Sequence, residues 1–144
     1  MNNKDSFKIE GALHIKVIGE NGEIKQEVKV KNAVKNAGLY GLLDQVLASP
    51  TVGKVTHMAV GTGTPGATAL GTEADRNALS TKTRSNAVLT MVGDWAAGDG
   101  TGALTEAGLF DADASGNMWC STTFAAINKG AADALQITWT ITIS

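Results

Sequence analysis

Apolar and polar residues alternate along the first thirty positions of the chain. Between residues 7 and 18 one face carries only apolar side chains, namely Phe7, Ile9, Leu13, Ile15 and Val17. Residues 24–30 alternate in the same way, and the Asn21-Gly22 pair between the two segments is typical of a two-residue type I′ turn. These features predict an antiparallel β-hairpin.

The turn also predicts a register for this hairpin. Closing the chain on Asn21-Gly22 places Glu20 opposite Glu23 and then matches apolar with apolar and Lys with Glu. The expected pairs are Val17 with Gln26, Lys16 with Glu27, Ile15 with Val28, and Leu13 with Val30.

The period changes to a helical one in residues 33–48. A stripe recurs at helical spacing, formed by Val34, Ala37, Leu39, Leu42, Leu43, Val46 and Leu47. Asn32 is the expected N-cap, and Pro50 ends the helix. Gly38 and Gly41 each weaken a helix by roughly 1 kcal/mol relative to Ala, and close packing against a sheet would explain them.

The rest of the chain has the pattern of short strands separated by turns. Strands are expected at 54–60, at 78–95 as two strands around Ser85-Asn86, at 103–110, at 118–127 and at 134–143, with a long loop at 61–77. We therefore predict a mainly β fold, a jelly-roll-like β-sandwich of about eight strands with an N-terminal hairpin and one short helix. A single domain over residues 1–144 is expected, with residues 1–6 as a candidate N-terminal arm.

Composition narrows the classes of partner. Twelve Lys and Arg against 14 Asp and Glu give a net charge of −2, so we expect no direct nucleic-acid binding and no attraction to acidic membranes. The single cysteine excludes an intrachain disulfide and fits a protein made in a reducing cytoplasm. No secretory signal and no apolar run of about 18 residues are visible.

The segment "HMAVGTGTPG" invites comparison with a phosphate-binding loop. Gly61, Gly63 and Gly66 match the G-x-G-x-x-G spacing, but Pro65 interrupts the loop and no amphipathic helix follows. The Lys of a Walker loop is missing as well. We interpret the segment as a turn at the rim of the sandwich, whose small residues permit positive φ angles and close contact with a neighbouring chain.

"DADASGN", residues 111–117, resembles the first half of a calcium loop. Asp111, Asp113 and Ser115 alternate and Gly116 holds the sixth position, but Thr122 stands where a bidentate Glu is required. A hairpin turn is the favoured interpretation, and whether Asp111 and Asp113 bind an ion stays open.

No catalytic constellation is recognisable. His14 and His57 are isolated, and no Ser, His and Asp set has the spacing of a triad. Cys120 is expected to be a buried, inert thiol. Trp95 is either at the edge of the core or an interface anchor. We expect no enzyme activity, no cofactor and no metal.

Five sequence motifs follow one another along the chain in an order that resembles a known class of proteins. "KNAVKNAGLYGLLDQVL", "VTHMAVGTGT", "ALGTEADR", "GALTEAGLFDADASGNMW" and "FAAINKGAADALQITWTITIS" follow one another over about residues 28–144. This order resembles small virion structural proteins of tailed bacteriophages, most of all capsid decoration (cement) proteins. The resemblance implies a homotrimer on the capsid surface that binds the major capsid protein and bridges neighbouring capsomers.

Two other roles remain open. One is a tail-fibre or baseplate-associated protein involved in host attachment, and the other is a carbohydrate- or cell-binding module. The small size of the chain favours decoration over a fibre. The residues singled out for contact with the capsid or between subunits are Asn3, Lys4, Phe7, Glu73, Asp75, Arg76 and Trp95.

Overall fold

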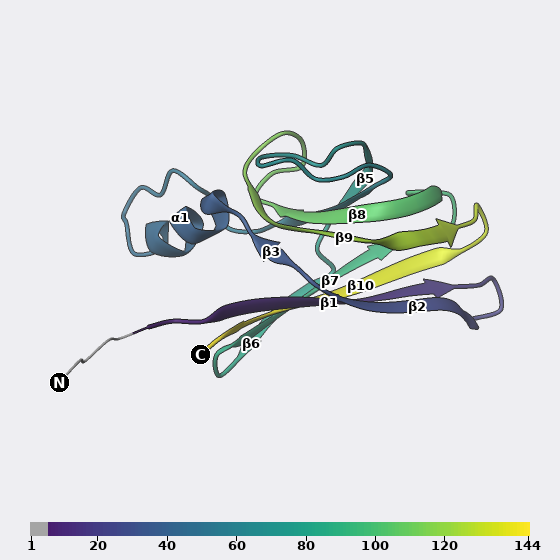
Figure 1. Ribbon diagram of the computed structural model, residues 1–144, viewed down its shortest axis with the longest axis horizontal. Coiled ribbons are helices and arrows are strands. Elements are labelled where there is room, and N and C mark those ends of the chain that lie inside the picture. Colours follow the sequence, from purple (N-terminus) through teal and green to yellow (C-terminus); the bar gives the residue numbers. More distant parts are fainter. Residues whose placement is uncertain (1–5) are drawn as a thin grey trace.

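Two five-stranded antiparallel sheets pack face to face in the computed structural model, which describes residues 6–144 (Figure 1). The elements in chain order are β1 (Ile9–Ile18), β2 (Ile24–Lys31), β3 (Ala33–Val34), α1 (Asn36–Asp44), β4 (His57–Gly61), β5 (Glu73–Ala78), β6 (Thr81–Ser85), β7 (Val88–Trp95), β8 (Gly102–Phe110), β9 (Met118–Lys129) and β10 (Ala134–Ile143). One sheet has the order β2-β1-β10-β7-β6 and the other β3-β9-β8-β4-β5. The predicted class, a mainly β sandwich with an N-terminal hairpin and one helix, is confirmed.

The core lies between the sheets because the inward positions of the strands are apolar. Along β10, Leu135, Ile137 and Trp139 are buried while Gln136 and Thr138 between them are partly exposed. They join side chains of β4, β8 and β9 in one cluster that links both sheets. Each large apolar side chain buried in this way contributes about 1.5–3 kcal/mol.

The N-terminal hairpin has the predicted register away from its turn. Val17 pairs with Gln26, Lys16 with Glu27, Ile15 with Val28 and Leu13 with Val30. The predicted turn is wrong, because Gly19 pairs with Glu23 and only Gly22, with φ 82°, has a positive φ there. This is a three-residue loop with a bulge, which shifts the register between Val17 and Ile18.

The structure contains ten strands, whereas about eight were expected. The first additional strand is β3, two residues that the helical pattern had absorbed and that pair with β9. The second is β5, which lies at the edge of its sheet and pairs with β4. Its sequence, EADRNA, is almost wholly polar, so no apolar alternation marks it.

The helix is shorter than predicted and faces the sheet with different residues. It begins after Lys35 instead of Asn32 and ends at Asp44. Gly38 and Gly41 are its buried residues, and both lie against Trp119 of β9, which confirms the close packing expected of them. Its leucines, Leu39, Leu42 and Leu43, are exposed.

Candidate interaction site

The loop between β4 and β5, residues 62–72, covers the outer face of the β8 strand. Its backbone donors converge on one carboxylate, that of Glu106, which is fully buried. Gly63 N donates to Glu106 Oε1 at 2.9 Å, Thr72 N to the same oxygen at 2.8 Å, and Gly71 N to Oε2 at 2.8 Å. The loop thus has the convergent N–H groups of an anion site, and a side chain of the same chain occupies them.

The glycines of this loop serve close approach of its two sides. A Cβ at Gly63 would lie 2.7 Å from Thr72 N, and a Cβ at Gly71 would lie 2.6 Å from Thr64 N. The expectation of positive φ angles in this loop is wrong, since the positive-φ glycines of residues 6–144 all lie elsewhere, at Gly22, Gly98, Gly100, Gly102 and Gly116. The loop needs glycine for space, not for a left-handed backbone.

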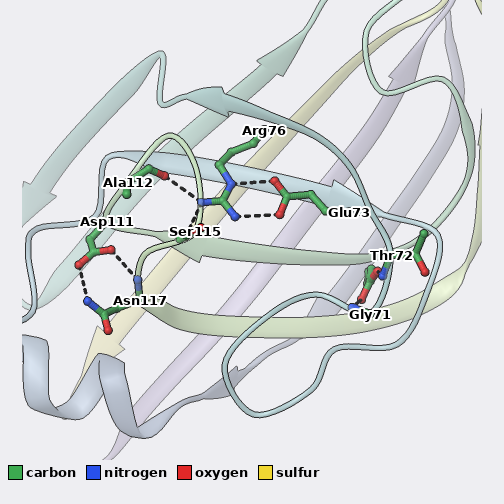
Figure 2. Close-up of polar contacts among 9 residues, drawn as sticks. Gly71, Thr72, Glu73, Arg76, Asp111, Ala112, Ser115 and Asn117 are labelled. Carbon is green, nitrogen blue, oxygen red and sulfur yellow. Dashed lines mark hydrogen bonds and ion pairs between the residues drawn. The ribbon is translucent and has the colours of Figure 1, made fainter.

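Arg76 and Glu73, two of the predicted contact residues, bind each other on β5. Arg76 donates to both Glu73 carboxylate oxygens at 2.8 Å, as Figure 2 shows. Its Nη1 also donates to the carbonyls of Ala112 and Ser115 at 2.9 and 2.8 Å, and its guanidinium lies 3.7 Å above the Phe110 ring. With its side chain 6% exposed, Arg76 holds the loop between β8 and β9 in place.

The 111–117 loop is organised by Asp111. Its carboxylate accepts a bond from Gly53 N at 3.0 Å. It also accepts bonds from Asn117 Nδ2 at 2.8 Å and from Asn117 N, which Figure 2 shows. Burial raises the pKa of Asp111, but these bonds outweigh it and the pKa lies below its ordinary value. The hairpin-turn interpretation is confirmed, because β8 and β9 pair antiparallel on either side.

The calcium alternative can be examined over the described part of the chain. Within residues 6–144 no group of three or more His, Cys, Asp and Glu side chains is placed to hold a metal ion. The carboxylate oxygens of Asp111 already serve the loop itself.

The cysteine and the histidines are spread over different strands. Cys120 is buried in β9, as expected, and burial raises the pKa of its thiol to about 12, so the thiol is protonated at neutral pH. His14 contacts Glu27 on the outer face of the hairpin, and His57 Nδ1 lies 2.7 Å from Thr56 Oγ1.

The tryptophans belong to the interior. Trp95 is 1% exposed, so of the two alternatives for it the core is correct, and its side chain is not accessible for contact with another chain. Trp119 is also buried; its indole donates to Gly53 O at 3.1 Å while α1 rests on its ring.

Of the remaining predicted contact residues, Phe7 is exposed. It precedes β1 on an extended segment and is 84% exposed, with Lys8 paired to Ser144 just beyond it. Asp75 is half-buried on β5. Asn3 and Lys4 lie outside the described residues.

Comparison of this chain with protein-family models, with curated proteins and with solved structures found no match. In the part of the chain that the structure describes, no helix has the length and hydropathy needed to cross a membrane.

The sequence reasoning missed an apolar surface at the end of the sandwich where α1 lies. We call it the apolar end surface; it consists of exposed side chains of α1, of the turn after it and of the segment before β1, namely Phe7, Leu39, Tyr40, Leu42, Leu43, Val46 and Leu47. Ile24, in the hairpin at the opposite end of the molecule, is the other large hydrophobic exposed in residues 6–144 (Figure 1).

An apolar cleft of about 390 Å³ opens beside this surface. Gly38 and Leu42 of α1 form one wall, Ile9 and Ile143 line it from the opposite sheet, and Trp119 contributes as well. Because Leu42 belongs to both, the cleft and the exposed helix face are continuous. Helical periodicity identified the leucines of α1 as one stripe. The sequence signal for their exposure was Gly38 and Gly41, which occupy the face of α1 turned to the sheet.

Proposed function

We propose that this chain is a non-enzymatic structural protein of a tailed-phage virion, which decorates the capsid and stabilises it by bridging neighbouring capsomers. It would be made in the host cytoplasm and act on the capsid surface as a homotrimer bound to the major capsid protein. The chain-long order of motifs over residues 28–144 supports the phage assignment.

The observation that carries a binding role is the apolar end surface. Of the eight large hydrophobics exposed in residues 6–144, seven lie at one end of the sandwich, and Val46 is 87% and Leu43 70% exposed. Scattered apolar residues are normal on a protein surface, but a gathered patch marks a contact with another molecule. A rigid β-sandwich with such a patch favours a structural protein that binds neighbouring proteins through a preformed surface.

The polar clusters support a structural role in a second way. Glu106, Arg76 and Asp111 each direct their side chains at backbone groups of long loops. These loops are therefore fixed in shape, which favours contact by a preformed surface with little ordering on binding. Three linked copies would add avidity to individually weak contacts.

Immunogold electron microscopy of intact phage particles tests this proposal, with antibody raised to the chain. Particles that lack the gene serve as the control for antibody specificity. Dense, even labelling of the head is expected, and heads lacking the protein should then lose their DNA at lower temperature. Labelling confined to the tail would overturn the decoration proposal in favour of host attachment, and unlabelled particles would overturn a virion role altogether.

A further inference from the structure

We infer that the apolar end surface is where copies of this chain bind one another. This rests on the proposed function for its biological setting and deepens it by naming the partner of that surface.

The area of the surface fits an interface between proteins. Its six residues on α1 and the turn after it expose on the order of 600 Å², about what one partner contributes to the smaller specific interfaces. The largest apolar patch on a typical monomer is about 300–600 Å². The surface is therefore of the size of a small specific interface between proteins.

The helix explains why the surface is contiguous. Gly38 and Gly41 turn toward Trp119, so the opposite side of α1 faces solvent. Leu39 and Leu43 follow one another at helical spacing on that side, Val46 lies in the turn just after the helix, and Leu42 continues the surface to the cleft.

The shape is complementary to itself. Leu42 lines a recess of about 390 Å³, and Leu39 and Leu43 project from the same helix. A cavity of about 150 Å³ lined by apolar side chains accommodates a benzene ring, so this cleft has room for an apolar side chain of a neighbour. One chain thus supplies both the projection and the recess, which is what association of identical subunits requires.

The α1 face offers little charge for an oppositely charged partner, and the charged residue among those that line the cleft is Arg84. The only charged residue within α1 is Asp44, and its carboxylate accepts bonds from Thr51 and Val52 of its own chain. Identical subunits that meet around a symmetry axis bring the same groups of each subunit together. Apolar side chains can pack against each other in this way, whereas like charges would repel.

Sedimentation equilibrium of the purified full chain tests the inference, at concentrations up to about 100 μM, where association with a micromolar Kd is nearly complete. We expect an oligomer, and a trimer if the proposed function holds. The double variant Leu43→Glu, Val46→Glu should weaken association by at least about 100-fold, since each side chain loses its burial and adds a charge.

The matched control is Ile24→Glu, which places the same charge on an exposed apolar residue, 53% exposed, at the opposite end of the molecule. It should leave association unchanged. Val46→Ser alone keeps the test valid if the double variant does not fold, because Val46 lies after the end of α1 and is almost fully exposed.

A monomeric wild-type chain at about 100 μM would overturn the inference. So would equal weakening by the α1-end variants and by Ile24→Glu, or a monomer that carries an apolar small molecule in its native mass spectrum. The outcome is separable from that of the virion role: labelled heads with a monomeric protein would refute the self-association and the homotrimer but leave the decoration role, and an oligomer absent from particles would refute only the virion role.

Discussion

Replacing Glu106 by glutamine removes one acceptor from the centre of the 62–72 loop without changing the size of the side chain. Oε1 can still accept from Gly63 and Thr72, but an NH₂ group then faces Gly71 N–H, which donated to Oε2 at 2.8 Å. A buried donor without a partner costs about 1–3 kcal/mol, and the two remaining bonds lose the benefit of a charged acceptor, about 1 kcal/mol in total or more. We expect the free energy of unfolding to fall by about 2–4 kcal/mol.

For a chain of this length that change lowers Tm by about 6–12 °C, which thermal unfolding at a single protein concentration measures. Glu20→Gln, at an exposed position in the hairpin turn, is the control and should change stability by less than about 0.5 kcal/mol. Hydrogen exchange adds a local measurement, because the amides of Gly63, Gly71 and Thr72 should lose protection before those of the core strands. Equal stability of the two variants would refute the assignment of Glu106 as the residue that holds the loop.

Three further predictions concern the other buried groups. Arg76→Lys loses the paired hydrogen bonds and the contact with the Phe110 ring, so it should lower the free energy of unfolding by about 1–2 kcal/mol. Proteolysis within residues 111–117 should also become faster. An unchanged rate of cleavage would contradict the role of Arg76 in holding that loop. Gly41→Ala should destabilise by about 1–3 kcal/mol in urea unfolding despite the better helix propensity of Ala, because the added Cβ would lie 2.6 Å from Trp119 Cε2; a more stable variant would show that α1 can shift freely. Cys120, with a pKa of about 12, should resist iodoacetamide at pH 8 until urea unfolds the chain, and rapid labelling of the folded protein would disprove its burial.

The parts of the fold that sequence could predict are those determined by neighbours along the chain. The alternation of residues 7–18 and 24–30 was sufficient for four correct pairs of the hairpin, because a side-chain period of two selects the face and the register together. The turn was wrong for a related reason. A single-residue bulge near it leaves the pairs further away unchanged, so the pattern does not distinguish the two loops.

The candidate site depended on partners far away in sequence. Glu106 occupies a strand whose pattern predicts nothing unusual, and its donors are backbone amides 34 to 43 residues away. Any residue except proline supplies such an N–H, so no side-chain signature marks the partners. Likewise, helical spacing identified the stripe on α1, but which side meets the sheet depends on Trp119, a strand residue distant in sequence.

The orientation of α1 is the feature that most needs an explanation outside the isolated chain. Burying a Leu or Val fully contributes about 1.5–3 kcal/mol, so the exposed parts of Leu39, Leu43, Val46 and Leu47 leave on the order of 4–8 kcal/mol unrealised within the fold. That is comparable to the whole stability of a typical domain, about 5–15 kcal/mol. A helix selected only for stability would turn such residues inward and its glycines outward. The observed arrangement does the reverse, which is consistent with a segment whose apolar contacts form between chains.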